Sequence, residues 1–252
     1  MITFENSPVQ IGSFNVLANS ASISLNNPMR GTTKFGTPGY YSEVREGRAV
    51  GTFSVTYYMT DTDEAVRNLF SGSGIQLVNM SVGPYRCYSG VANSMSMSID
   101  PYSVVSCTLD MSFYNGYDQG GSHSSIATPP DLIHGGASDA YGNLLWGTDI
   151  VSCEYSLSQS ISPVYALGER TPSGYTRNDG VLEVGLQGTG WGHIIDFSTG
   201  CEGYTTGYIN LTGVCTGTAG GQIPFSGHIM NPDVTVAPNE EIIGSLTVFG
   251  TF

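Results

Sequence analysis

The chain has 252 residues, and 40% of them are apolar. Together with 15 Tyr and 10 Phe, these residues are enough for a hydrophobic core. No run approaches the ~18 apolar residues that a membrane-spanning helix needs. The net charge is −13, and residues 126–252 set only Arg170 and Arg177 against 12 acidic residues. This excess of acidic residues disfavours a conventional nucleic-acid binding site, which requires clustered Lys and Arg.

The N-terminus predicts a cytoplasmic origin, and the cysteines predict neither a disulfide framework nor a zinc site. Met1–Asn6 has no basic head followed by an apolar run, so we expect no Sec-type signal. An odd number of cysteines at wide intervals argues against an intramolecular disulfide framework, and no CxxC pair or nearby His indicates a zinc site. The cysteines are Cys87, Cys107, Cys153, Cys201 and Cys215.

Alternation of apolar and polar residues with a period of two runs through the chain and predicts half-buried strands. Apolar side chains alternate over 105–113 and again over 95–99, and Asp100–Ser103 supplies a turn between them, so this region predicts an antiparallel hairpin. Short strands with turn signals between them predict an all-β antiparallel sandwich or barrel. The other predicted strands are Ser20–Asn26, Phe53–Met59, Val151–Ser158, Val181–Leu186, Gly207–Thr212, Gln222–Met230 and Ile242–Phe249.

One short helix is predicted after Asp61-Thr62-Asp63, whose side chains can cap free amide groups. It would bury Val66, Leu69 and Phe70 on one face and plug one end of the sandwich. Acidic residues at its start also suit the helix dipole.

The two halves of the sequence resemble each other at a near-constant offset. Pro28 matches Pro163, 135 residues later, and Pro38 matches Pro172, 134 residues later. In the last strands, Leu109 and Phe113 align with Leu246 and Phe249 at offsets of 137 and 136. We therefore predict a duplicated β-domain, with a first copy over 1–115, a Gly-, Ser- and Pro-rich linker or arm over 116–148 and a second copy over 149–252.

Signatures of catalysis and metal binding are weak, so we predict no catalytic, cofactor-binding or metal-binding residues. The local group His193, Asp196, Ser198 and Cys201 fits no triad or metal spacing. The acidic residues near Asp61 lack the glycine and distal Glu of a calcium loop and are better explained as helix caps. The pair Glu240-Glu241 is most simply a solvated turn.

Tyrosines offer an alternative of a different class. Tyr40, Tyr41, Tyr204 and Tyr208 would suit the platform of a carbohydrate-binding β-sandwich module. Tyrosine is equally favoured at protein–protein contacts, because it buries much area at small entropic cost. Composition does not choose between the two.

The segment Tyr155–Gly168, followed by Thr171-Pro172, resembles the strand-and-loop region of long-tailed bacteriophage tail tube proteins. These often place a Pro-x-Tyr-x-Leu-Gly stretch, here Pro163–Gly168, before a long loop. The match covers about 30 residues and is echoed at Leu25–Val50. The resemblance implies a β-sandwich or barrel with one short helix, whose sheets join side by side into rings that stack into a tube for DNA ejection.

The resemblance also implies where subunits meet. Met29–Ala49 and Val164–Asp179 would be the long loops that reach a neighbouring subunit or ring. Two domains per chain suggest a homotrimeric ring with six similar positions instead of six chains. The candidate contact residues are Lys34, Phe35, Pro38, Tyr40, Tyr41, Tyr165, Leu167, Arg170, Pro172 and Tyr175.

The expected partners are further copies of the chain, the tape measure, tail terminator and baseplate proteins and, in a contractile tail, the sheath. DNA would be a transient cargo of the lumen, kept mobile by an acidic wall, and no membrane is involved. The expected location is the virion tail, assembled in the host cytoplasm. Within the same class, the alternative is a trimeric baseplate hub or tail-tip protein.

Overall fold

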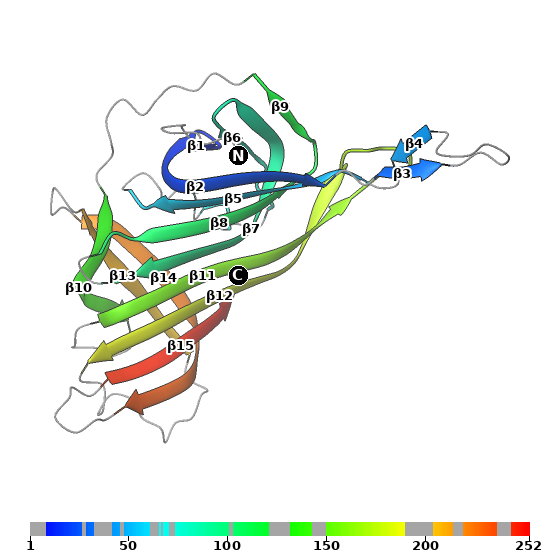
Figure 1. The fold of residues 1–252 in the computed structure, drawn as a ribbon. Coiled ribbons are helices and arrows are strands. Elements are labelled where there is room, and N and C mark those ends of the chain that lie inside the picture. The colour runs from blue at the N-terminus through cyan, green and yellow to red at the C-terminus, as the bar shows by residue number, and fades with distance from the viewer. Residues whose placement is uncertain are drawn as a thin grey trace.

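The computed structural model describes residues 9–26, 29–32, 42–45, 48–60, 66, 68–70, 74–100, 103–120, 132–142, 150–189, 204–213, 219–235 and 243–252. These residues form an all-β, antiparallel structure (Figure 1), as the period-two pattern predicts. All nine predicted strands are confirmed, and most are longer than predicted. The hairpin between 95–99 and 105–113 is confirmed as well.

The first half contains nine strands, six of which close into a barrel. The barrel path is β7-β6-β1-β2-β5-β8, and a further ladder between β8 and β7 closes it. β3 and β4 form a separate hairpin, the first arm, inserted between β2 and β5. The bounds are β1 Val9–Ile11, β2 Phe14–Asn26, β3 Met29–Thr32, β4 Ser42–Arg45, β5 Val50–Tyr58, β6 Val78–Val82, β7 Tyr85–Ile99, β8 Ser106–Phe113 and β9 Tyr117–Gln119.

The second half is one curled sheet in the order β10-β13-β14-β15-β12-β11. Two neighbouring strands, β11 and β12, extend as a hairpin beside the first arm (Figure 1). The bounds are β10 Ile133–Gly142, β11 Ile150–Val164, β12 Gly174–Thr189, β13 Tyr204–Gly213, β14 Ala219–Thr235 and β15 Ile243–Thr251.

Strand β7 joins the halves because its neighbour changes along its length. Its first part, up to Gly90, pairs with β6 of the barrel. On the same edge its second part, Ser94–Ile99, pairs with Cys153–Ser158 of β11. The other edge pairs with β8 throughout 90–98. One sheet therefore runs without interruption from the barrel into the second half.

The same order of pairing occurs in both halves. The first half runs β2-β5-β8-β7-β6 and the second runs β11-β12-β15-β14-β13, so the five strands correspond one to one in chain order. A shared detail fixes the alignment: Gly51 lies opposite Phe113, and Gly180 accepts a backbone hydrogen bond from Phe252. At both glycines an added Cβ would collide with the ring or backbone of that phenylalanine.

This register corrects the sequence alignment of the last strands. The sequence places Phe113 with Phe249, whereas the ladders place Phe113 with Phe252, at an offset of 139. Phe249 points to the other face of its strand and is 38% exposed, while Phe113 is fully buried. Matching residue types alone allowed a slip that reversed the face.

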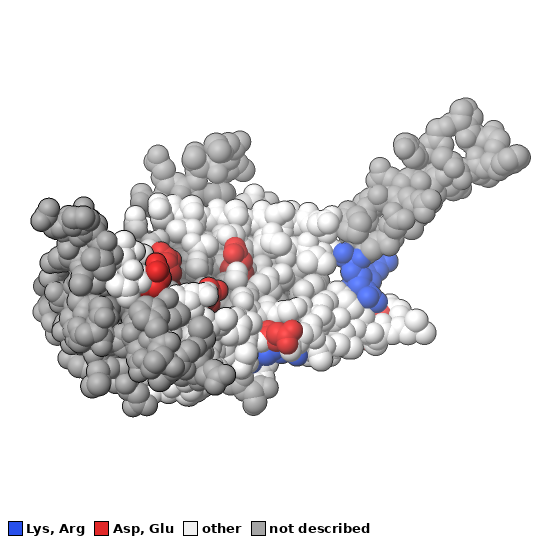
Figure 2. All heavy atoms as spheres, turned by 90° about the horizontal axis from the view of Figure 1, so that it is seen from below, with Lys and Arg blue, Asp and Glu red and all other residues white. Residues whose placement is uncertain are grey.

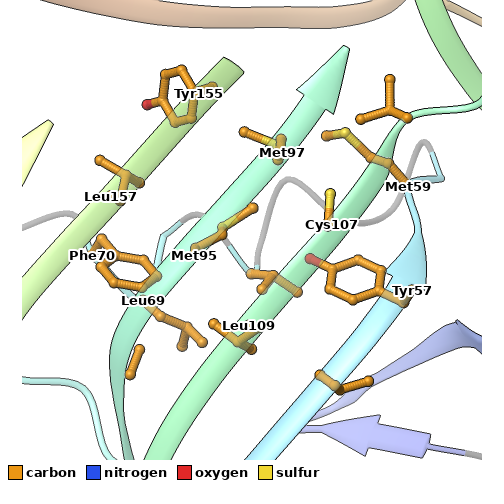
Figure 3. Close-up of a cluster of buried hydrophobic side chains, with 14 of the residues drawn as sticks. Tyr57, Met59, Leu69, Phe70, Met95, Met97, Cys107, Leu109, Tyr155 and Leu157 are labelled. Atoms are coloured by element: carbon orange, nitrogen blue, oxygen red, sulfur yellow. The ribbon is translucent and has the colours of Figure 1, made fainter. Parts of the chain in front are cut away.

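The inward faces of the strands build one hydrophobic core that crosses the junction. Figure 3 shows side chains from β5, β8, β7 and β11 on one face, with Leu69 and Phe70 lying against them. Val66, Leu69 and Phe70 are buried, as predicted. The Leu69 N–H donates to the Val66 carbonyl at 3.1 Å, but most of the predicted helix lies outside the described residues.

Three predicted loops contain strands, and the first of them, Met29–Ala49, holds the β3–β4 hairpin. Within 116–148, predicted as a linker or arm, β9 pairs with β7, and the glycine-rich β10 pairs with β13. Pairing with a neighbour overrides the weak strand propensity of glycine there. Of the predicted loop Val164–Asp179, only 165–173 is loop, because Val164 already pairs with Gly174.

Candidate assembly surfaces

The outer face of the sheet that spans both halves is polar, and we call it the polar face. It is formed by alternate residues of β5, β8, β7, β11 and β12, whose other side chains enter the core. Side-chain hydrogen bonds connect neighbouring strands across it. Ser94 Oγ donates to Asp110 Oδ2 at 3.1 Å, and Ser98 Oγ donates to Glu154 Oε1 at 3.0 Å across the β7–β11 junction.

The strands of the polar face carry mainly acidic residues. Asp110, Glu154 and Glu183 lie on β8, β11 and β12, whereas β5, β8, β11 and residues 94–99 of β7 contain no Lys or Arg, and β12 contains one basic residue, Arg177. Figure 2 shows acidic side chains spread over the body of the molecule, while the largest basic group lies where the arm begins. A surface of this kind repels phosphate backbones.

The β11–β12 hairpin, here called the second arm, ends in an exposed tip. The tip closes through two bonds to the Val164 carbonyl, from Ser173 N at 2.8 Å and from Ser173 Oγ at 3.2 Å. Gly168 adopts φ +85°, which permits the turn. Leu167 is fully exposed at this turn. An exposed leucine on a closed hairpin tip suits insertion into a partner surface.

A cluster of tyrosines lies next to the tip of the second arm. Tyr114, at the end of β8, lies 5.7 Å from Tyr175 between ring centroids. The guanidinium of Arg48, which follows the first arm, stacks over the Tyr165 ring at 3.5 Å from its centroid. This cation–π contact therefore ties the base of the first arm to the tip of the second arm.

Burial changes the chemistry of this cluster. Desolvation is the main cause that raises the pKa of Tyr114 and of Tyr175, with smaller contributions from neighbouring tyrosines. Both phenols therefore stay neutral across the physiological pH range. The cluster acts as an aromatic contact, and its charge comes from Arg48.

The structure brings half of the predicted contact residues together. Leu167 and Arg170 are exposed at the tip of the second arm, and Tyr165, Pro172 and Tyr175 are partly exposed along it. The other five, Lys34, Phe35, Pro38, Tyr40 and Tyr41, lie outside the described residues.

Other sequence candidates fall largely outside the described part. The group His193, Asp196, Ser198 and Cys201 does so, as do Asp61 and Glu240-Glu241. Of the four platform tyrosines, only the side chain of Tyr204 is described; it is exposed and lies edge-on to His228 at 5.3 Å. Among the described residues, no group of three or more His, Cys, Asp or Glu is placed to hold a metal ion.

Sequence reasoning missed Arg48, Tyr114 and the edges of β2 and β14. Arg48 and Tyr114 meet Tyr165 and Tyr175 through the β7–β11 junction, which carries no short-range sequence signal. That these edges pair with no described residue is visible only once the ladders are known.

No helix in the described part of the chain is both long and apolar enough to cross a membrane. Comparison with known proteins adds no relative: no protein-family model matches the chain. No curated protein matches its sequence either.

Proposed function

We propose that the chain is a structural virion protein that assembles into stacked rings and forms the tail tube through which phage DNA leaves the capsid. In this proposal each chain contributes two related β-domains, and three chains complete a ring with six similar positions. The protein resides in the virion tail after assembly in the host cytoplasm, and it performs no bond chemistry.

The observation that carries the proposal is the edge-to-edge junction of β7 and β11. Two halves with the same strand order are joined there as neighbours in one sheet. Repeating such a junction from chain to chain produces either a closed ring or an open filament, depending on whether the rotation closes. Closure removes exposed strand edges, which otherwise promote aggregation.

The polar face supports the same proposal, because a tube needs a wall that does not hold DNA. Asp110, Glu154 and Glu183 provide negative charge on a face rich in Ser and Thr. Attraction to each phosphate would slow a moving duplex, whereas an acidic wall lowers its residence time. We assign this face to the lumen.

The arms support stacking between rings. Both leave the body on the same side (Figure 1). Arg48 at the base of the first arm contacts Tyr165 at the tip of the second. The exposed Leu167 at the tip of the second arm is then the residue that enters the next ring.

Electron microscopy of the purified protein, together with light scattering, tests the proposal. We expect rings with six lobes from three chains, stacked into tubes of variable length. Isolated rings that never stack would instead support the trimeric hub or tail-tip protein. A monomer that persists at high concentration would contradict ring assembly.

A further inference from the structure

The β7–β11 junction has an equivalent in those parts of the edges of β14 and β2 that pair with no described residue of the same chain. β14 corresponds to β7 and β2 corresponds to β11 in the shared strand order. On its β13 side, β14 is paired only up to His228, so no described residue pairs with 229–235. On its β1 side, β2 is paired only over 14–16, so no described residue pairs with 17–26.

We propose that residues 229–235 of β14 pair antiparallel with the open edge of β2 in a second copy of this chain, in the register of the β7–β11 junction. The inference rests on the proposed ring and names its interface. Each open edge pairs with the other edge in a second copy, because the chain already contains the same kind of pairing between β7 and β11.

The ladders fix the register. Leu25 lies opposite Gly51, and Gln159 lies opposite Gly180, so Leu25 corresponds to Gln159. By the same alignment Ile23 corresponds to Leu157. On the other side, Met95 faces Leu109 and Ile229 faces Val248, so Ile229 corresponds to Met95. Since Leu157 faces Met95 within the chain, Ile23 of one copy is expected to face Ile229 of the next.

Burial agrees with this assignment. Met95 and Leu157 are buried at the internal junction. Ile23 and Ile229, in the corresponding positions, are only partly buried, although both contact the core. A neighbouring strand on each edge would complete their burial, as β7 and β11 do for each other.

A polar pair is also preserved, with its partners exchanged. Within the chain, Ser98 donates to Glu154 across the junction. Asp233 corresponds to Ser98, because Asp233 faces Ser245 of β15 and Ser98 faces the equivalent Ser106 of β8. Ser20 corresponds to Glu154. The second junction therefore places the carboxylate on the β14 side and the hydroxyl on the β2 side.

Cysteine pairs on the outer face test the register, because a disulfide requires the two Cα atoms to lie within about 7 Å. Ser22 and Met230 correspond to Ser156 and Ser96, which face each other. In a Cys201→Ser, Cys215→Ser background, the pair Ser22→Cys with Met230→Cys should give covalent dimers and trimers on mild oxidation. The products are read by non-reducing electrophoresis.

Three controls make the result specific. In the pair Ser22→Cys with Thr235→Cys, the second cysteine lies four ladder positions from Met230, because β14 has a bulge between Met230 and Asp233. This shift is roughly 13 Å along the strand and should give about tenfold less product. Ser96→Cys with Ser156→Cys should close within one chain and give no oligomer. The single variant Ser22→Cys should stay monomeric in the gel, since dimers from it alone would indicate β2–β2 pairing and overturn the proposal.

The outcomes separate this inference from the proposed function. Rings by microscopy with in-register cross-links support both. Rings in which the shifted pair cross-links equally well, or the in-register pair does not, overturn the register while leaving the tube intact. A folded monomer that forms a disulfide within one chain, or none, overturns the interface together with ring assembly.

Discussion

The two halves share a strand order but differ in how far each is completed by its own residues. In the first half β1 pairs with both β2 and β6, and β7 pairs with β8, so the six strands close. In the second half no ladder joins the described residues of β10 and β11. The first half is therefore a closed barrel, and the second is a curled sheet that relies on its neighbour.

The cores differ in the same direction. Among the side chains that the structure describes, the fully buried aromatic residues all lie in the first half: Tyr57, Phe53, Phe70 and Phe113. In the second half aliphatic residues such as Val184, Leu186 and Ile223 are fully buried, and the buried aromatic residues Phe225 and Tyr155 keep 3% and 5% exposure. Because burial of apolar area stabilises a fold roughly in proportion to that area, about 25 cal/mol per Å², the first half should contribute more to stability.

The largest expected effect comes from the equivalent phenylalanines. Phe113→Ala should lower the free energy of unfolding by about 3–5 kcal/mol, because it empties a fully buried site over Gly51. Phe252→Ala should cost much less, about 1 kcal/mol, because Phe252 is 41% exposed and contacts Phe70 only edge-on at 6.4 Å. Urea denaturation followed by tryptophan fluorescence measures both.

Equal losses from the two substitutions would contradict the asymmetry between the halves. Phe249→Ala is the matched control, since Phe249 lies in β15 on the outer face and should leave stability nearly unchanged.

The sequence predicts where strands lie better than which strands are neighbours. Alternation placed Met95, Cys107 and Leu109 in the core, because a period of two is a local property of one strand. Alternation did not predict that β7 changes its neighbour from β6 to β11 between Gly90 and Ser94. That change depends on where β6 ends and where β11 begins to pair with β7. Alternation also missed β10, whose Gly135 and Gly136 hide its strand character.

The candidate site follows the same division. The loop with Leu167 and Arg170 was predicted from a resemblance that rests on the neighbouring residues Pro163–Gly168. The contact between Arg48 and Tyr165 was not, because it joins distant segments through the junction of the halves. Local chemistry is readable from sequence, whereas contacts set by sheet topology need the ladders.

The second expected effect concerns Gln159, which occupies in the second half the place of Leu25 in the first. Gln159 is buried, and its Nε2 donates to the Ala92 carbonyl at 2.8 Å, where β6 ends and β11 begins along β7. Gln159→Glu should destabilise the protein at pH 7 by roughly 1–3 kcal/mol, because an ionised carboxylate cannot donate to that carbonyl.

The loss should shrink as the pH falls. Burial raises the pKa of the introduced carboxyl above its unfolded value of about 4.3, so the penalty is present above that value and disappears in acid, where the protonated group donates again. Urea denaturation at a series of pH values measures it. Leu25→Glu, on an open edge, should show a smaller loss and a weaker pH dependence; identical profiles would contradict the buried junction.

A third expectation uses buried thiols as reporters of each half. Cys87 in β7 and Cys153 in β11 are both buried. Desolvation raises the pKa of Cys87 to about 12 and that of Cys153 as well, so at pH 8 both remain protonated thiols and react only when the fold opens. Cys153 should be alkylated about tenfold faster than Cys87. This ratio corresponds to a free energy of local opening that is about 1.4 kcal/mol lower around Cys153.

Mass spectrometry of the two peptides after timed alkylation reads these rates, in a Cys201→Ser, Cys215→Ser background. Faster labelling of Cys87 would contradict the view that the closed barrel is the more stable half. If rings form, their assembly should slow Cys153 more than Cys87, because it completes the sheet of the second half.

The smallest expected effect is the contact that ties the arms together. Arg48→Ala should reduce stability by about 0.5–1 kcal/mol, because the guanidinium lies over an accessible ring at 3.5 Å from its centroid. A double-mutant cycle with Tyr165→Leu isolates the pairwise energy, measured by urea denaturation. The cycle should give a similar coupling, and Arg48→Lys should retain only part of it because the planar stacking is lost. A coupling of zero would mean that the two arms are positioned independently, and the first arm would then owe its direction to β2 and β5 alone.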